Sequence, residues 1–384
     1  MDVHRYIAAL TKFVENRNFA GYDPYDALNS PVIRTLTLGS KYGRIAWTQL
    51  IRRLPFNLRP LLSVPQGHNP KGLGLFLGGY VKLYKANPQP AILRNIHYLL
   101  DLLTKLRSPG YSGSCWGYNF DWQSRTFFIP KYTPTIVNSS FIGHSLLDTW
   151  QVTGEQRALD MAVSIKDFLL CDLYRKVEGD SFCFSYTPID HTAVHNANLL
   201  GASLLIRLFE VTGEEQLKEA ALASLAYSMK YQHDDGAWYY AENAIQRWID
   251  SFHTGFNLEA IRRFLWLEEG LEYQSAYERG LNFYAENFFL ADGTPKYYHD
   301  RKYPVDIHAP VQAVAFFSGE GEKYRELTDR VLSWMVKNMW DASGYFYFRK
   351  GRYLTNKIPY MRWGQAWAFH ALTEYASMNA NDKP

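Results

Sequence analysis

The stretch HNANLLGASLLIRLF, residues 195–209, decides the fold. Polar residues lead into a segment that is apolar almost all round and holds small residues, as expected of a helix packed on every side. Four further stretches share this pattern: VNSSFIGHSLLDTW (137–150), FHTGFNLEAIRRF (252–264), IHAPVQAVAFF (307–317) and RWGQAWAFHALTEY (362–375). Gly143 and Gly201 are 58 residues apart, as are His195 and His253. A fixed period of this length predicts one supersecondary unit that is copied several times.

A second kind of helix lies between these stretches. Its apolar residues recur at three- and four-residue steps and charged residues fill the remaining positions, which predicts an outer helix with one buried stripe. Outer helices are expected at 91–106, 155–170, 214–231, 271–288 and 322–339, with an N-terminal helix at 3–17 as the sixth. Inner helices are expected to start near Gly72, Asn138, Asn196, Thr254, Ala309 and Trp363.

Six hairpins of inner and outer helices predict an all-α fold, the (α/α)6 barrel or six-hairpin toroid. Short β-hairpins are expected in its loops, at 236–240 and 344–349. An open solenoid of helix pairs is the alternative, but its usual repeat of roughly 34 to 47 residues is shorter than the period found here. We predict a single domain over residues 1–384, in which the N-terminal outer helix and an extra helical segment, together residues 1–65, pack on the barrel. One extra helix is expected within 30–54.

Composition narrows the classes of function. A net charge of +3 without a Lys/Arg block argues against a nucleic-acid partner. No stretch is long and apolar enough to span a membrane, and the first residues lack the apolar run of a signal peptide, so we expect a cytoplasmic protein. The three cysteines show no paired spacing, so neither a disulfide framework nor a zinc site is expected. Aromatic residues make up 16% of the chain, and many lie in loops, where their rings suit the C–H faces of sugars.

The candidate site lies in the loops at one end of the predicted barrel. The links VTGEQR and VTGEEQ are short and join inner to outer helices, so the long loops lie at the opposite end, which we call the mouth. Long loops on a rigid scaffold commonly carry function. The predicted catalytic residues are Asp121, His195, Asp250, His253 and His308. The predicted substrate-binding residues are Asp23, Asp26, Trp116, Asp190, Asn196, Tyr240, Asp306, Arg362 and Trp363.

Several of these aspartates also have a purely structural interpretation. Asp190, Asp250 and Asp306 each precede an inner helix, where Asp is a common cap. Asp23 and Asp26 flank Pro24 and Tyr25 in a turn, a position that Asp favours without any catalytic role. Capping and turn formation are therefore alternative explanations for the presence of these carboxylates.

Three chemistries fit the residues at the mouth. A pair of carboxylates with separated pKa values can hydrolyse a glycosidic bond, and Asp26, Asp121 and Asp250 are the candidates. Alternatively, imidazoles can move a proton at the carbon next to a carbonyl or carboxylate, for which the candidates are His195, His253 and His308 with Arg362 as the enolate partner. A metal held by three converging histidines is the third possibility.

The alternating hairpins and the aromatic mouth resemble the six-hairpin glycosidase superfamily, which includes unsaturated glucuronyl hydrolases and N-acylglucosamine 2-epimerases. GYDPYDALNS (21–30), together with HNANLLGASLL (195–205) and FHTGFNLEAI (252–261), resembles barrel proteins encoded in bacterial exopolysaccharide and surface-glycan gene clusters. The resemblance covers roughly residues 23–375 and implies a sugar-related role. Similarity to the 2-epimerases implies two catalytic histidines, for which His253 and His308 are the candidates.

Together these observations predict a carbohydrate-active enzyme of bacterial surface-polysaccharide metabolism, with no cofactor and no metal. Hydrolase-like or lyase-like acid/base cleavage of a glycan, an acidic glycan among the candidates, is the first prediction. A sugar epimerase that uses two histidines is one alternative, and a non-catalytic glycan-binding or assembly protein on the same barrel is another. The expected partners are a saccharide substrate and other polysaccharide-assembly proteins.

Overall fold

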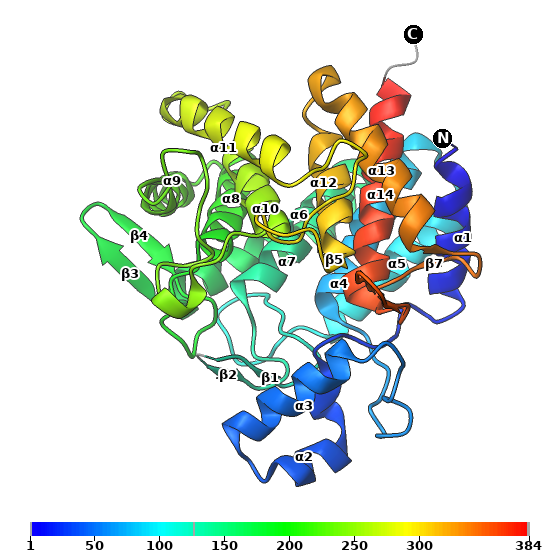
Figure 1. Cartoon of the computed structure of the whole chain (residues 1–384). Helices are drawn as coiled ribbons and strands as arrows, with labels where there is room; N and C mark the ends of the chain where they lie inside the picture. Colours follow the sequence, from blue (N-terminus) through cyan, green and yellow to red (C-terminus); the bar gives the residue numbers. More distant parts are fainter. Residues whose placement is uncertain (1, 126, 382–384) are drawn as a thin grey trace. The chain divides into compact units, whose positions relative to one another are not determined.

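A computed structural model describes residues 2–125 and 127–381 (Figure 1). The backbone divides into two compact units, which are described separately below. The terminal unit combines both ends of the chain, Met1–Leu106 and Tyr303–Pro384, with the segment Gly117–Thr133. The central unit comprises Arg107–Trp116 and Pro134–Lys302.

The central unit contains three helical hairpins. Its helices are α6 (Ile136–Thr153), α7 (Gln156–Asp167), α8 (His195–Thr212), α9 (Glu215–Met229), α10 (Ser251–Arg262) and α11 (Gln274–Asn287). The even-numbered helices are the inner ones, because α8 packs against both α6 and α10, while each odd-numbered helix packs on its predecessor. Gly154 and Gly213 end α6 and α8 with φ of +74° and +71°, a backbone conformation that glycine adopts without strain.

Glycine at position 201 is required by the close packing of α6 and α8. A Cβ atom at this position would lie 2.4 Å from Cδ1 of Ile136. The repeat marked by Gly143 and Gly201 is therefore a repeat of close helix contacts, since a Cβ at Gly143 would likewise lie 2.7 Å from Leu204.

The terminal unit supplies three further inner helices and three outer ones. They are α1 (His4–Glu15), α4 (Pro70–Ala86), α5 (Pro90–Lys105), α12 (His308–Phe317), α13 (Arg325–Met339) and α14 (Trp367–Asn381). Helix α14 packs against α4, α12 and α1, while α5 packs on α4 and α13 on α12. The first and last helices of the chain are thus neighbours, and the predicted inner and outer helices are confirmed.

The extra helical segment forms two helices rather than the single helix expected within 30–54. These are α2 (Pro31–Thr37) and α3 (Lys41–Arg53), which form a small lobe of the terminal unit (Figure 1). The chain turns between them because Leu38 and Gly39 have φ of +47° and +73°, and the Ser40 hydroxyl then caps α3. A local core holds the lobe together; it consists of Ala27, Leu28, Ile33 and Ile51, with Trp47, Leu58, Leu62 and Phe128 packed against it.

The strands are short and lie in loops. They are β1 (Trp122–Gln123), β2 (Phe128–Ile129), β3 (Arg175–Glu178), β4 (Ser181–Phe184), β5 (Val305–Asp306), β6 (Trp340–Asp341), β7 (Tyr345–Phe346), β8 (Arg349–Lys350) and β9 (Thr355–Asn356). They pair antiparallel as β1–β2, β3–β4, β6–β7 and β5–β8–β9. The hairpin expected at 236–240 is wrong, because this segment contains no strand, and the β3–β4 hairpin was not expected from the sequence.

Short helical turns complete the secondary structure. They are η1 (Asp26–Asn29), η2 (Phe168–Asp172), η3 (Ala244–Gln246), η4 (Leu271–Tyr273), η5 (Glu322–Tyr324) and η6 (Met361–Ala366). Two of these, η2 and η6, are π-helical, and each continues or begins a longer helix. Among the helices that the structure describes, none has both the length and the apolar content needed to cross a membrane.

Candidate active site

Asp250 and His253, two of the predicted catalytic residues, form a hydrogen-bonded pair at the start of α10. Oδ1 of Asp250 caps the helix by accepting the His253 backbone N–H at 3.0 Å. Oδ2 accepts from His253 Nδ1 at 2.7 Å and from the indole N–H of Trp248 at 2.9 Å. Because a carboxylate can only accept, the proton of the neutral imidazole lies on Nδ1.

The second ring nitrogen of His253, Nε2, is available for proton transfer. It makes no hydrogen bond with any residue that the structure describes, and 21% of the side chain is exposed, against 1% for Asp250. A buried carboxylate thus fixes the tautomer and orientation of a partly exposed imidazole, the arrangement of a general base. Asp250 therefore both caps α10 and orients the His253 imidazole.

An aromatic pair lies beside this imidazole. The rings of Tyr240 and Trp248 stack almost parallel, with their centroids 4.5 Å apart and an interplanar angle of 11°. The Tyr240 ring centroid lies 4.7 Å from that of His253. Both aromatic side chains are half-buried. A sugar that stacks on such a surface would present its polar edge to the imidazole.

His195, at the start of α8, forms a second imidazole–carboxylate pair. Its Nε2 lies 3.1 Å from Oε1 of Glu242, and its Nδ1 lies 3.3 Å from the Ser228 hydroxyl. The hydrogen bond with His195 lowers the pKa of the Glu242 carboxyl below its ordinary value. Unlike His253, His195 is almost fully buried, whereas Glu242 is partly exposed. In this pair the carboxylate, not the imidazole, is accessible to a ligand.

The segment 240–248 connects the two pairs. Its Tyr240 carbonyl accepts the backbone N–H of His195 at 3.2 Å, and the Tyr240 N–H donates to the Trp248 carbonyl at 2.9 Å. One loop therefore carries Glu242, which contacts His195, and Trp248, which contacts Asp250. The central unit brings together Tyr240, His195, Asp250 and His253 from the predicted set.

Three other predicted residues of the central unit have different surroundings. The two oxygens of Asp190 accept four hydrogen bonds from Thr187 and Thr192, so this carboxylate stabilises its own turn. Trp116 is fully buried. Asn196 is also buried, and its Oδ1 has no hydrogen-bond partner among the described residues.

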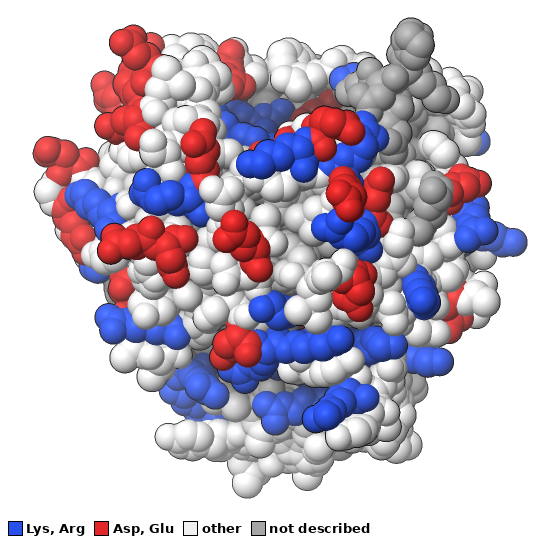
Figure 2. Space-filling model, turned by 45° about the horizontal axis from the view of Figure 1, so that its top comes forward, with Lys and Arg blue, Asp and Glu red and all other residues white. Residues whose placement is uncertain are grey.

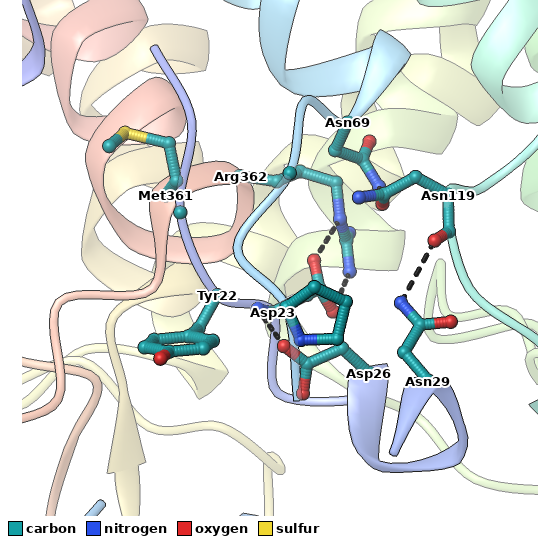
Figure 3. A pocket seen from close by; sticks show the side chains of 11 residues that line it. Tyr22, Asp23, Asp26, Asn29, Asn69, Asn119, Met361 and Arg362 are labelled. Atoms are coloured by element: carbon teal, nitrogen blue, oxygen red, sulfur yellow. Dashed lines mark hydrogen bonds and ion pairs between the residues drawn. The ribbon is translucent and has the colours of Figure 1, made fainter. Parts of the chain in front are cut away.

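In the terminal unit, Asp23 and Asp26 belong to a buried network of charged groups (Figure 3). Arg362 donates two hydrogen bonds to the Asp23 carboxylate, of 2.6 and 2.8 Å. Oδ2 of Asp26 accepts the Asp23 backbone N–H at 2.9 Å, and Oδ1 accepts from Arg59 Nε at 2.6 Å. Arg59 also donates to the Tyr360 hydroxyl at 2.7 Å and to the Asp23 carbonyl at 2.8 Å.

A small polar pocket opens beside this network, and Asn69 and Asn119 lie on its opposite side (Figure 3). Asn69 Nδ2 donates to Asn119 Oδ1 at 2.9 Å, and Asn29 donates to the Asn119 carbonyl at 3.0 Å. The predicted residues Asp23, Asp26 and Arg362 therefore do lie together. Their mutual ion pairs and hydrogen bonds make this group chiefly a structural one.

Burial raises the pKa of the Asp26 carboxyl to about 6, although the Arg59 guanidinium acts in the opposite direction. The folded protein therefore holds this proton more tightly than the unfolded chain, where the pKa is 3.8. The stabilisation that this proton gives the folded protein is complete when the pH is below 3.8, the pKa of Asp26 in the unfolded chain. It is lost as the pH rises through about 6, the pKa of Asp26 in the folded protein. We expect the unfolding free energy of the wild type, relative to Asp26→Asn, to fall by about 2 kcal/mol between about pH 4 and pH 7.

Urea unfolding of both proteins across this pH range measures that difference. Asp121→Asn is the matched control, because this carboxylate is not fully buried, and its difference from the wild type is expected to stay within about 0.5 kcal/mol. A wild type that gains stability over Asp26→Asn with rising pH would contradict the prediction.

Asp306 and His308 occupy a third setting, at the start of α12 in the terminal unit. Asp306 is fully buried and accepts hydrogen bonds from Arg349 at 2.6 Å and from the Trp363 indole N–H at 2.7 Å. The His308 ring packs on Trp363 with centroids 3.9 Å apart, and on Trp367 at 5.3 Å. Two tryptophan rings thus lie against the His308 imidazole.

Asp121 lies in a groove of the terminal unit with a volume of about 260 Å³. Its Oδ1 accepts the Lys131 backbone N–H at 2.8 Å. His68, Arg34 and Tyr132 also line the groove, and Asp121 is the one carboxylate among its lining residues. The groove thus lacks the second carboxylate that glycoside hydrolysis ordinarily uses.

Glu242, Trp248 and Arg59 are not among the residues predicted from the sequence. Glu242 and Trp248 lie in a loop that varies from one repeat to the next, so the period gives no indication of them. Arg59 lies in the extra helical segment, outside the repeat altogether. An arginine in a tract without acidic residues was a usable signal, because a buried cation must find its carboxylate elsewhere in the chain.

Comparison with known proteins identifies the fold. The sequence matches no protein-family model and no curated protein. The structure is similar to a protein from Listeria innocua, with a TM-score of 0.65 at 13% identity over 100% of this chain and 99% of that chain. It is similar to a GH76 α-mannanase from Bacteroides thetaiotaomicron, with a TM-score of 0.64 at 12% identity over 82% of this chain and 87% of that chain. It is also similar to cellobiose 2-epimerase from Bacillus thermoamylovorans, with a TM-score of 0.59 at 16% identity over 80% of this chain and 88% of that chain.

These similarities show that the chain has an (α/α)6 barrel fold. The helix hairpins described for each unit agree with this fold class, and the predicted fold is confirmed. At such low sequence identity the similarity concerns the fold, and the activity has to be argued from the chain's own residues.

Proposed function

We propose that the protein is a carbohydrate-active enzyme that moves a proton at the carbon next to a sugar carbonyl, with His253 as the base. The observation that carries this proposal is the available Nε2 of His253 on an imidazole oriented by the buried Asp250. Epimerases and hydrolases both occur among proteins of similar structure, so the choice between them rests on the site.

In the proposed reaction the open-chain sugar stacks on Tyr240 and Trp248, and the proton on C2 passes to His253 Nε2. The C–H electron pair becomes the π-bond of an enediolate, and Asp250 stabilises the imidazolium that forms. Once the enediolate has turned its other face to the His253 imidazolium, return of the proton to C2 gives the epimer. Transfer of the proton to C1, with the O2 proton moving to O1, gives the ketose. Glu242 is the accessible acid nearest in the chain to this aromatic pair, and its lowered pKa suits a carboxylate that holds a sugar hydroxyl.

The carboxylates favour this reaction over hydrolysis. Asp26 and Asp250 are buried and hydrogen-bonded, and the groove around Asp121 holds no second carboxylate. Cytoplasmic location and a place in bacterial surface-glycan metabolism belong to the same proposal. The support for the place in surface-glycan metabolism is the likeness of the segments 21–30, 195–205 and 252–261 to proteins of surface-glycan gene clusters.

Proton exchange in D2O tests the proposal. The wild type is incubated with reducing sugars, among them mannose, glucose, N-acetylglucosamine, glucuronate and cellobiose, and the C2–H signal is followed by NMR. Loss of this signal with appearance of an epimer or ketose is expected for at least one sugar. Release of new reducing ends from oligosaccharides without exchange would identify a hydrolase instead. Saturation transfer to a bound sugar with neither reaction would identify a binding protein.

A further inference from the structure

The lobe formed by α2 and α3 has an unusual charge distribution. The sequence contains no Asp or Glu between Asp26 and Asp101, and none between Asp341 and Glu374. Both tracts contribute to the terminal unit. Within them, exposed lysines and arginines occur without acidic neighbours in sequence.

The two tracts contact each other at several places, and one of these contacts lies beside the lobe. Asn356, on β9, donates its side-chain N–H to the Leu54 carbonyl at 2.7 Å, immediately after the end of α3. The tight turn Gly351–Leu354, closed by a backbone hydrogen bond of 2.8 Å, therefore extends from a strand attached to the lobe. We call the lobe, residues 30–62, together with this turn the basic–apolar surface.

Large apolar side chains are concentrated on the basic–apolar surface. Leu38 is 89% exposed, Tyr42 and Leu61 are 80% exposed, and Tyr353 in the attached turn is 86% exposed. Further exposed apolar residues on this surface are Val32, Leu36, Leu50, Phe56 and Leu354. They stand on helices and turns, and none of them lines the groove around Asp121.

The cations of this surface lack counterions. Arg34, Lys41, Arg53, Arg352 and Lys357 are exposed, and none forms an ion pair with a carboxylate in the part of the chain that the structure describes. Figure 2 shows lysine and arginine side chains gathered in its lower part with few acidic ones between them. A field of unpaired positive charge attracts an extended anionic surface.

We propose that the basic–apolar surface docks the protein on an anionic lipid bilayer. Cations at the level of the headgroups and apolar side chains inserted between them are the two components of interfacial binding. Both are present on α2 and α3, and the attached turn adds Tyr353 and Leu354 beside Arg352. The inference is independent of the proposed activity, because none of these residues belongs to the candidate active site.

Vesicle co-sedimentation of the full chain tests the proposal. Vesicles of phosphatidylcholine are compared with vesicles that contain about a third phosphatidylglycerol, at about 0.1 M salt and at about 0.5 M salt. At the lower salt concentration, binding to the anionic vesicles is expected to be at least about tenfold stronger than to the neutral ones, and the added salt is expected to weaken it.

Charge variants locate the binding surface. Arg34→Gln with Lys41→Gln is expected to weaken binding to the anionic vesicles by about 25-fold, since each cation near the membrane contributes about fivefold. The matched control is Lys85→Gln with Arg94→Gln, which removes two exposed cations of the same unit from α4 and α5 and is expected to change binding by less than about twofold.

Apolar variants distinguish insertion from pure charge attraction. Leu36→Gln with Tyr42→Gln is expected to weaken binding about tenfold, because their apolar groups leave the headgroup region. The control Leu271→Gln replaces a leucine of the central unit that is as exposed as Leu36, at 55%, and binding is expected to be unchanged.

The proposal is overturned if anionic vesicles do not bind the wild type, or if the surface and control variants bind alike. In the first case an acidic protein becomes the better candidate for a partner of this surface. Circular dichroism of every variant establishes that a loss of binding is not a loss of folding.

Discussion

Replacement of His253 by Gln is expected to lower kcat for sugar proton exchange by about a thousandfold, because general base catalysis typically contributes two to four orders of magnitude. Gln keeps a polar side chain of similar reach but cannot take up the proton. Sugar binding, followed by saturation transfer, is expected to change by less than about threefold, since the Tyr240 and Trp248 rings remain. Loss of exchange with retained binding is thus the signature of a catalytic base.

His191→Gln is the matched control for this variant. His191 is an exposed histidine of the central unit whose ring packs against Tyr174, and no carboxylate within residues 2–125 and 127–381 pairs with it. Its replacement is expected to leave exchange within about twofold of the wild type. Exchange that survives at full rate in His253→Gln would exclude His253 as the base.

Asp250 acts through His253 and is a positioning residue. Asp250→Asn is expected to lower kcat less than His253→Gln does, and to displace the pH profile of exchange, because an amide can present its N–H to Nδ1 and favour the wrong tautomer. A purely structural role in capping α10 would lower the amount of folded protein without moving that profile.

Replacement of Arg59 by Leu is expected to lower the free energy of unfolding by about 3 to 5 kcal/mol, the loss typical when one partner of a buried ion pair is removed. Arg59 is fully buried and donates to Asp26, to the Tyr360 hydroxyl and to the Asp23 carbonyl. Its removal leaves the Asp26 carboxylate buried without its cation. Urea unfolding at neutral pH measures the loss.

Arg53→Leu is the control, because Arg53 is an exposed arginine of the same segment; its effect is expected to stay within about 0.5 kcal/mol. The double variant Arg59→Leu with Asp26→Asn is expected to recover part of the loss, because it removes the unpaired charge. A loss of less than about 1 kcal/mol in Arg59→Leu would mean that the network contributes little to stability.

The fold was largely predictable because it depends on a pattern that every repeat carries. Small and apolar residues on all sides of the segments near 138, 196 and 254 predict inner helices, and Gly201 shows why, since a side chain there would collide with Ile136. The break between α2 and α3 was not predictable from that pattern. It depends on the left-handed conformation of Leu38, which apolar residues seldom adopt.

The candidate site was predictable only in part. The period places His195 and His253 at equivalent positions of consecutive inner helices, and both do meet a carboxylate. The partners differ, because Asp250 lies three residues before its histidine, whereas Glu242 comes from a loop outside the pattern. Arg362 and Asp23 are separated by 339 residues, a pairing that no local spacing can reveal.

The chain order of the two units has a consequence for biosynthesis. The central unit is nearly continuous in sequence, whereas the terminal unit needs the last part of the chain, from Tyr303 onward, to supply α12, α13 and α14. During translation the central helices can form their hairpins while α1 and α4 still wait for α14, their neighbour in the finished protein. The nascent chain therefore exposes the apolar sides of α1 and α4 until α14 has been synthesised, and chaperones can bind these sides during that time.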